Sequence, residues 1–302
     1  MPRWLVWTPC WLRASASQSD MEAEHHVREV HAVARAGFGA EAEAYDRARP
    51  TYPPEAVRWL IANLDIGPGR RVADLAAGTG KLTELLAPAG ADLLAVEPVS
   101  AMLARLRARL PAVPALSGLA EALPFRGDSL DAVLVAQAFH WFDADRALAE
   151  LARVIRPGGR LGLAWNARSR TGGWADAVWA VMDRVERKAP WRDDRAAGQD
   201  ALPTPSGADR KQRWSERLIT GGPQSPWSPW IEGTFYHDQS VTPGDVVDRI
   251  RSVSHVAALA PGPQAAVLDE IRAILREHPQ TRGRDQLSLR YRTDVMYAER
   301  VR

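Results

Sequence analysis

Short apolar runs alternate with longer amphipathic segments through the middle of the chain. The run at 129–139 is apolar at nearly every position, and the shorter runs at 70–76 and 91–98 are mainly apolar, which is typical of strands buried on both faces. Between them, 80–90 and 100–110 carry apolar residues at helical spacing. Strands that alternate with helices of this length form a parallel sheet covered on both sides. The pattern therefore predicts a doubly wound α/β sandwich with its ligand at the carboxyl ends of the strands.

The alternation continues and then changes beyond residue 166. A helix at 143–155, a turn at 156–159, a strand at 160–166 and a further short strand near 114–118 are expected. Later in the chain the pattern predicts helices at 174–188, 242–253 and 263–278 and strands at 232–241 and 287–301. The segment 190–212 is rich in Pro, Gly and Asp and is expected to be a mobile loop.

These elements suggest four regions. We expect a disordered extension at 1–20, a helical cover at 21–65, a ligand-binding core at 66–170, and C-terminal helices and strands at 171–302 that complete the sheet and the acceptor pocket. Pro9 interrupts the apolar start of the chain, which favours an extension over a signal peptide.

Composition excludes several classes of function. The formal net charge of the 302 residues is only +2, and the basic residues are scattered among acidic ones, which argues against nucleic acid as a partner. No apolar segment is long enough to cross a bilayer, so a cytoplasmic protein is expected. The single cysteine, Cys10, and the isolated His25, His26 and His31 offer no framework for a metal site. The pattern does not predict an oligomeric state.

The stretch DLAAGTGKLT, residues 74–83, links an expected strand to an expected helix. It is not a Walker A loop, because Leu82 follows Lys81, and Thr83 replaces the third glycine of a dinucleotide fingerprint. Asp74 also stands at the mouth of the loop, where its charge would repel a pyrophosphate and attract a cation. S-adenosylmethionine carries a sulfonium and an ammonium, so it suits this loop better than a polyanion.

A second acid follows the next strand. Glu97 lies 23 positions after Asp74, at the distance where nucleotide folds place an acid that binds the ribose hydroxyls. Either residue alone could be a turn cap or a surface charge. Both at successive strand ends predict a site for a cationic nucleoside.

Four segments resemble the successive motifs of class I S-adenosylmethionine-dependent methyltransferases, in the small-molecule branch called methyltransferase type 11. They are VADLAAGTGKLT, LLAVEPVSAML, GLAEALPFRGDSLDAVLVAQAFHWF and ARVIRPGGRLGLAWN. Pattern and resemblance together predict a Rossmann-like sandwich with a mostly parallel seven-stranded sheet and an antiparallel last strand.

The resemblance implies a set of cofactor-binding positions: Asp74, Ala76, Gly78, Gly80, Glu97, Pro98, Met102, Ala120, Glu121 and Gln137. Two departures stand out. Ala76 and Ala77 replace the more usual Gly-Cys pair. Leu119 stands where many relatives have the Asp that receives the adenine amino group, so that contact is expected to fall to Glu121 or to the backbone.

The methyl acceptor is expected beside the segment that follows the fourth strand. The substrate-pocket candidates are Tyr45, Arg49, Tyr52, Phe139, His140, Trp141 and Asn166. His140 is the candidate catalytic residue, either as a general base or as an orienting and packing histidine, and the second role is favoured. Arg49 could pair with a carboxylate or be a solvated helix-end charge. The cluster Trp174, Trp179 and Trp191 is expected to be core or lid packing.

The expected activity is methyl transfer to a small molecule, with O-methylation of a carboxylate or hydroxyl as the first hypothesis, because the nearest described relatives by motif include trans-aconitate-type carboxyl methyltransferases. A C- or N-methyltransferase of a secondary metabolite stays open. An NAD-dependent oxidoreductase and a non-catalytic nucleoside binder are the alternatives from other classes. The missing third glycine and Asp74 argue against the oxidoreductase.

Overall fold

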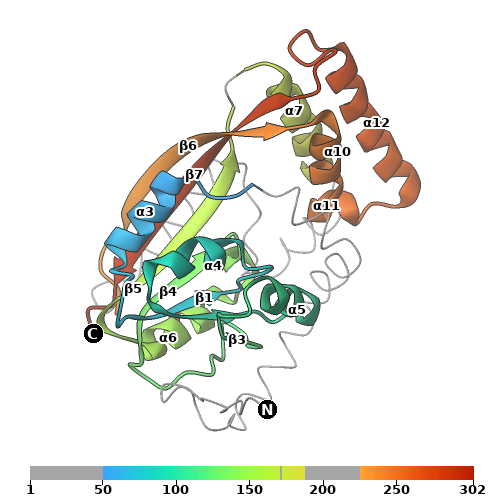
Figure 1. Ribbon diagram of the computed structural model, residues 1–302. Helices are drawn as coiled ribbons and strands as arrows, with labels where there is room; N and C mark the ends of the chain where they lie inside the picture. The colour runs from blue at the N-terminus through green and yellow to red at the C-terminus, as the bar shows by residue number, and fades with distance from the viewer. Residues whose placement is uncertain (1–49, 171, 188–224) are drawn as a thin grey trace, which may run out of the picture.

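A seven-stranded sheet organises the protein in a computed structural model that describes residues 50–170, 172–187 and 225–302 (Figure 1). The strands are β1 Arg71–Leu75, β2 Asp92–Val96, β3 Ala115–Leu116, β4 Leu130–Ala136, β5 Ile155–Arg168, β6 Ile231–Val241 and β7 Leu287–Glu299. Their spatial order is β3-β2-β1-β4-β5-β7-β6. β1 to β5 pair in parallel and β7 is antiparallel to both of its neighbours, so the predicted sheet is confirmed.

Helices cover the sheet on both faces and extend past one end of it (Figure 1). They are α3 Pro54–Asn63, α4 Lys81–Leu86, α5 Ser100–Arg109, α6 Ala144–Val154, α7 Trp174–Arg187, α10 Pro243–Arg251, α11 Ser254–Ala257 and α12 Pro261–Glu277, with short 3-10 turns η1 Ala87–Ala89 and η2 Phe139–Trp141. Local sequence marks several of their starts. Asp143 caps α6 through the amide of Arg146, and Thr242 and Asp245 form a capping box on α10.

The period-2 alternation of β4 divides its side chains between two apolar layers. Val133 and Val135 pack in the cluster that includes Leu151 of α6, while Leu134 packs in the cluster that includes Leu60 of α3. All five residues are at most 1% exposed. Burying each such side chain contributes roughly 1.5–3 kcal/mol, so the apolar run of β4 is the central support of the sheet.

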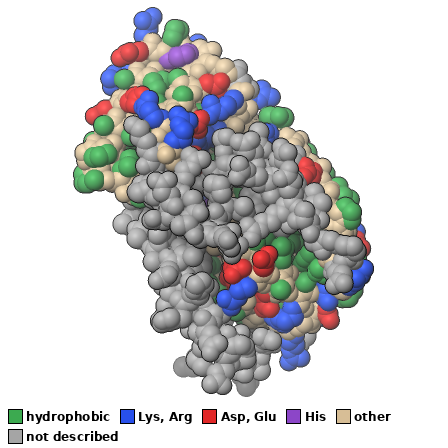
Figure 2. Space-filling model, turned by 180° about the vertical axis from the view of Figure 1, so that it is seen from behind, with side chains coloured by type: hydrophobic (Ala, Val, Ile, Leu, Met, Phe, Trp, Pro, Cys, Tyr) green, Lys and Arg blue, Asp and Glu red, His purple; other side chains and the backbone are tan. Residues whose placement is uncertain are grey.

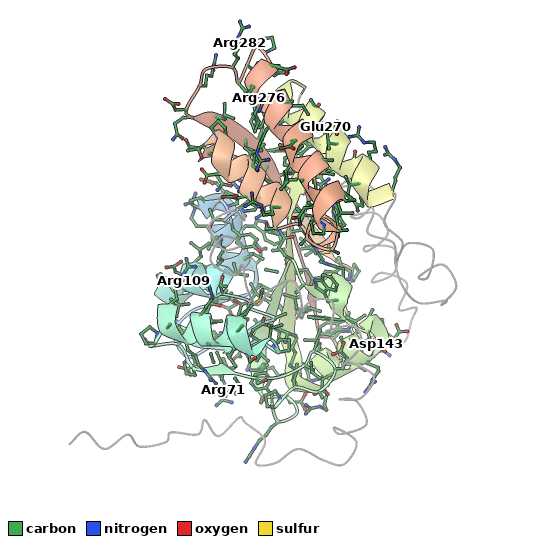
Figure 3. The ribbon with its side chains drawn as sticks, turned by 90° about the vertical axis from the view of Figure 1, so that its right-hand side faces the viewer. Arg71, Arg109, Asp143, Glu270, Arg276 and Arg282 are labelled. Carbon is green, nitrogen blue, oxygen red and sulfur yellow. The ribbon has the colours of Figure 1, made fainter. Side chains whose placement is uncertain are left out.

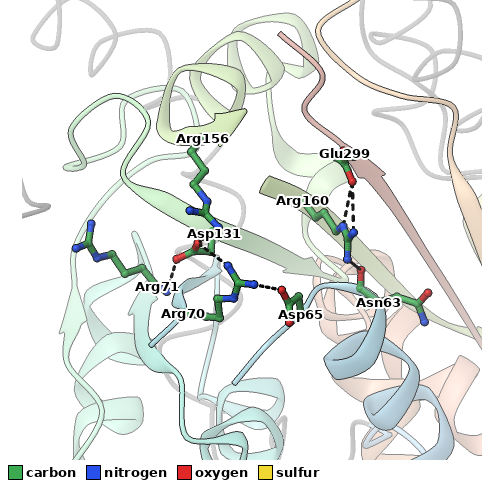
Figure 4. A network of polar contacts seen from close by, with 8 residues as sticks. All are labelled: Asn63, Asp65, Arg70, Arg71, Asp131, Arg156, Arg160 and Glu299. Carbon is green, nitrogen blue, oxygen red and sulfur yellow. Dashed lines mark hydrogen bonds and ion pairs between the residues drawn. The ribbon is translucent and has the colours of Figure 1, made fainter. Parts of the chain in front are cut away.

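Charged groups tie together the amino ends of the strands (Figure 4). Asp131 accepts the backbone N–H of Arg71 at 2.7 Å and forms ion pairs with Arg156 at 2.6 Å and Arg70 at 3.5 Å. This network lies at the edge opposite the glycine loop, because Arg71 begins β1 and Asp74 comes near its end. It therefore stabilises the sheet away from the expected ligand site.

The turn predicted at 156–159 is instead part of β5. The pairing of β5 with β4 shifts register between Leu130 and Ala132, and the extra residues bulge outward. Gly158, at φ 78°, donates its N–H to the carbonyl of Arg300. The C-terminal end of the chain therefore holds this bulge, and a local pattern could not show that contact.

A third apolar cluster forms where β6 and β7 extend beyond the sheet and meet α7, α10, α11 and α12. Trp174 and Trp179 are buried in it, which confirms their predicted packing role; Trp191 lies outside the described residues. Glu270 of α12, which Figure 3 labels, forms an ion pair with Arg184 of α7. On the face seen in Figure 2, which is the back of the view in Figure 1, acidic and basic side chains are interspersed over the described residues.

Among the described residues, none of the helices is long and apolar enough to cross a membrane. Nor does that part of the chain contain a group of His, Cys, Asp and Glu side chains that could hold a metal ion. Residues 1–49 and 190–212 lie outside the described residues, so the expected extension, most of the cover and the loop stay predictions. The proposed boundaries at 66 and 171 also stay predictions.

Candidate active site

The glycine loop reverses the chain between β1 and α4 through three residues in left-handed conformations. Ala76, Gly78 and Gly80 have φ values of 54°, 59° and 86°. A Cβ on Gly80 would lie 3.1 Å from side-chain atoms of both Leu106 and Leu110, whereas one on Gly78 would meet only the sulfur of Met102 at 3.9 Å. Gly80 is therefore required for packing and conformation, and Gly78 leaves open space on the ligand side of the loop.

Ala76 is strained because an alanine stands in the left-handed region that favours glycine. We expect Ala76→Gly to raise the free energy of unfolding by up to about 1 kcal/mol, since relief of the strain outweighs the added flexibility of the unfolded chain. Cofactor affinity should stay the same or improve. Urea unfolding and calorimetry measure both quantities, and a less stable glycine variant would show that the loop is relaxed as it stands.

Asp74 has a buried carboxyl group, and only one of its two oxygens accepts a hydrogen bond from the described residues. It is 1% exposed, and its Oδ2 accepts a 2.6 Å hydrogen bond from the hydroxyl of Thr83. Its Oδ1 is shielded from solvent and has no hydrogen-bond partner among the described residues. Burial, with a smaller contribution from Glu97, raises the pKa of Asp74 to about 7, against the lowering effect of the Thr83 hydrogen bond.

Glu97 is the second buried carboxylate. It is 3% exposed and follows β2 directly. Its two oxygens accept the backbone N–H groups of Gly78 and Val99, each at 2.8 Å. Burial raises the pKa of Glu97, and the two amides oppose that shift. The side chain therefore fastens the end of β2 to the glycine loop.

Together these features fit S-adenosylmethionine. Asp74 and Glu97 converge on a loop that leaves space at Gly78. An orphaned carboxylate oxygen in a buried position is suited to a cationic ligand, because unpaired buried polar groups are costly. The negative charges of the two carboxylates would repel a pyrophosphate at the same place.

The expected adenine side consists of residues after β2 and β3. Met102 and Ala120 are buried, and Pro98 is half-buried. Glu121 accepts the N–H of Asp143 at 2.8 Å through Oε1, while its Oε2 is shielded and without a partner among the described residues. Burial raises the pKa of Glu121. Its adenine contact stays a prediction, and its link to the start of α6 is a role that the sequence did not reveal.

The segment after β4 forms the compact turn η2. Gln137, at φ 59°, donates its N–H to the carbonyl of Ala164 at 2.9 Å, which anchors the segment to β5. Phe139 is fully buried in the core beside Phe142, with ring centroids 5.5 Å apart. His140 and the half-buried Trp141 lie with ring centroids 4.9 Å apart. Phe139 is placed as a core residue, and the contacts of all three with an acceptor stay predictions.

Asn166 joins three segments at the same edge. Its side-chain N–H donates to the carbonyl of Thr51 at 3.0 Å, and its Oδ1 accepts from the hydroxyl of Thr293 at 2.6 Å. Tyr52 next to Thr51 is buried. The other two pocket candidates, Tyr45 and Arg49, lie outside the described residues.

Comparison with known proteins identifies the family. The profile described as a methyltransferase domain matches residues 73–163. An uncharacterized methyltransferase of Mycobacterium tuberculosis is 39% identical over 256 residues, which cover 85% of this chain and 92% of that protein. The malonyl-[acyl-carrier protein] O-methyltransferase of Methylococcus capsulatus is 38% identical over 131 residues, covering 41% of this chain and 48% of that one. A solved structure from Anaeromyxobacter dehalogenans, described as a candidate type II methyltransferase, matches with a TM-score of 0.58 and 27% identity over 84% of this chain and 98% of that chain. The protein belongs to the class I S-adenosylmethionine-dependent methyltransferases.

Proposed function

We propose that the protein transfers a methyl group from S-adenosylmethionine, held at the glycine loop, to a carboxylate oxygen of a small molecule. The observation that carries the cofactor assignment is the buried, partly unpaired carboxyl of Asp74 next to Glu97. The choice of oxygen is supported by the segment 137–142, whose only ionisable side chain is His140. A carboxylate attacks without a base, whereas a hydroxyl needs a proton acceptor. The partial similarity to an O-methyltransferase supports the same choice.

Bound S-adenosylmethionine would supply a methyl group on a positively charged sulfur. The contribution of the protein is then mainly geometric, because the acceptor oxygen must lie in line with that sulfur at near-attack distance. Gln137 anchors the post-β4 segment to β5, and Glu121 anchors the following Asp143. Trp141 would exclude water beside the reacting atoms. These contacts hold the acceptor side steady relative to the glycine loop.

Labelled S-adenosylmethionine tests the acceptor atom. The enzyme is incubated with isotope-labelled methyl donor and a small-molecule extract, and the labelled products are treated with mild alkali. A carboxyl methyl ester releases its label as volatile methanol, whereas ether, amine and carbon-bound methyl groups are stable. Alkali-stable label in every product would refute the carboxylate proposal and favour a hydroxyl, nitrogen or carbon acceptor.

His140 separates a carboxylate from a hydroxyl acceptor. With a carboxylate, His140→Gln should lower kcat by less than about tenfold, since no proton has to be removed. Cofactor affinity should be unchanged. A loss of about a hundredfold in kcat with unchanged cofactor affinity would identify His140 as a general base.

A further inference from the structure

The side chains on the α3 side of the sheet change from apolar to polar along β7. Near α3, Val295 and Phe235 pack in the apolar cluster that contains α3 itself. Two residues further along β7, Thr293 bonds to Asn166 of β5. Two residues further still, Tyr291 pairs with His237 across the strands. Side chains alternate between the faces of a sheet, so all of these positions share one face.

The polar end of this face contains four residues that we call the distal cluster: His237, Gln239, Arg249 and Tyr291. The rings of His237 and Tyr291 are stacked, with centroids 5.7 Å apart and planes 29° from parallel. Arg249 comes from α10 and is only 5% exposed. Its guanidinium lies 5.0 Å from the centre of the Tyr291 ring, donates to the Tyr291 hydroxyl, and donates to Gln239 Oε1 at 2.9 Å.

His237 has unused hydrogen-bonding capacity. Both of its ring nitrogens are shielded from solvent, and neither has a hydrogen-bond partner within the part of the chain that the structure describes. Burial lowers the pKa of His237, and the charge of Arg249 adds to that effect against the opposing influence of Asp238. The ring is therefore neutral near pH 7, with one N–H donor and one acceptor nitrogen.

A purely structural role accounts for only part of the cluster. The bonds from Arg249 to Tyr291 and Gln239 hold α10 against the strands. They do not explain why the imidazole stacked on Tyr291 has two shielded nitrogens without a hydrogen-bond partner among the described residues. Buried polar groups normally have partners, so an orphaned pair points to a ligand that completes it.

The distal cluster lies on the same edge as the acceptor side of the active site. Ala164, which anchors Gln137, is four residues from Arg168, and Arg168 is paired with Tyr291. Four residues of strand correspond to about 13 Å. Arg168 itself is engaged elsewhere, over the ring of Trp179 at 5.3 Å and with Asp183 at 3.4 Å.

We propose that the distal cluster binds an anionic group of the methyl acceptor, at a site about 13 Å along the sheet edge from the methyl-transfer site. Arg249 would supply the positive charge, and His237 would supply an N–H donor. The identification of this ligand as the methyl acceptor rests on the proposed function, whereas anion binding at the cluster does not. The site selects elongated molecules with a carboxylate or phosphate at the end remote from the methylated atom, because a guanidinium and an N–H donor recognise either anion.

Binding of aliphatic dicarboxylates tests this site. The full-length protein, saturated with S-adenosylhomocysteine, is titrated by calorimetry with sebacate and with the much shorter succinate. Arg249→Gln should weaken sebacate binding about ten- to hundredfold, because hydrogen bonds to a charged group are lost. Tyr291→Phe and His237→Phe keep the stacked rings and should each weaken it severalfold. Wild-type affinity for succinate should be lower than for sebacate.

The control is Arg290→Gln, which removes the same charge from an exposed position one residue from Tyr291 on the other face of β7. It should leave sebacate binding within about twofold, as expected for a screened surface charge. Unfolding midpoints verify that each variant is folded. If Arg249→Gln does not fold, sebacate binding by Tyr291→Phe tests the proposal instead. If inorganic phosphate competes with sebacate, the cluster also accepts a phosphate end group. If it does not compete, the end group is restricted to a carboxylate.

The proposal is overturned if wild-type protein does not bind sebacate, or if all three cluster variants bind it as tightly as the wild type does. Because titration needs no methyl transfer, the outcome is independent of the proposed reaction. Retained anion binding without any carboxyl methylation would refute the reaction and leave the distal cluster in place.

Discussion

Replacing Asp74 with asparagine is expected to weaken S-adenosylmethionine binding by about a hundredfold, the effect of losing a desolvated charge pair of roughly 3 kcal/mol. Asparagine keeps the size of the side chain and can still accept the hydrogen bond from Thr83. What it removes is the negative charge that would face the sulfonium and the ammonium. The uncharged 5′-methylthioadenosine should bind the variant within about threefold of wild type, because it has no sulfonium or ammonium to interact with the charge of Asp74.

The same substitution should stabilise the cofactor-free protein at alkaline pH. The pKa of Asp74 is about 7 in the folded protein, above its ordinary value of 3.8. Between these values the folded state binds the proton more tightly, so the contribution of Asp74 to the free energy of unfolding decreases as pH rises from about 4 to about 7. The loss above pH 7 is at most roughly 4 kcal/mol, at 1.36 kcal/mol for each unit of pKa.

Asp74→Asn avoids this loss, although its own amide is buried, so a net gain of about 1–2 kcal/mol is expected at pH 8 and none near pH 4. Thermal unfolding at both pH values and calorimetry at pH 8 measure the two effects. Asp92→Asn is the matched control, since Asp92 is an exposed aspartate at the start of β2. A variant that binds the cofactor normally would contradict the assignment of the glycine loop.

Glu97→Gln is expected to weaken binding of both S-adenosylmethionine and 5′-methylthioadenosine about a hundredfold, because the acid is predicted to bind the ribose that both ligands share. Both carboxylate oxygens accept backbone N–H groups, from Gly78 and Val99. An amide would place an N–H against one of these donors. The free energy of unfolding should therefore also fall, by about 1–3 kcal/mol.

The contrast between the two variants is the decisive measurement. Loss of 5′-methylthioadenosine binding in Glu97→Gln, and its retention in Asp74→Asn, would assign the ribose to Glu97 and the charged methionyl part to Asp74. Glu84→Gln is the control for Glu97, since Glu84 is exposed on α4 and pairs with Arg109. If both active-site variants lost both ligands equally, the two carboxylates would act as one structural unit.

The family match ends at residue 163, just before Asn166. The distal cluster therefore belongs entirely to the part of the chain beyond the shared methyltransferase domain, on β6, β7 and α10. If anion binding there is established, acceptor choice depends on the C-terminal strands and helices, and the cofactor site depends on the parallel strands β1 to β5. Relatives matched only within the domain would then carry no information on the remote end of the acceptor.

Local sequence determined the cofactor side of the protein. Asp74, the glycine loop and Glu97 could be predicted because each signal lies within one strand and the turn after it, where spacing alone sets geometry. The apolar runs predicted the sheet for the same reason, since a strand buried on both faces must be apolar throughout. The caps of α6 and α10 are equally local.

Tertiary structure alone decided which distant residues meet and how deeply they are buried. Arg249 and Tyr291 are separated by 42 positions, and His237 joins them only because β6 and β7 pair in one register. Phe139, a pocket candidate in sequence, is fully buried because η2 folds it into the core. The raised pKa of Asp74 also depends on this packing. Burial and desolvation are sums over neighbours from the whole chain, so no local pattern contains them.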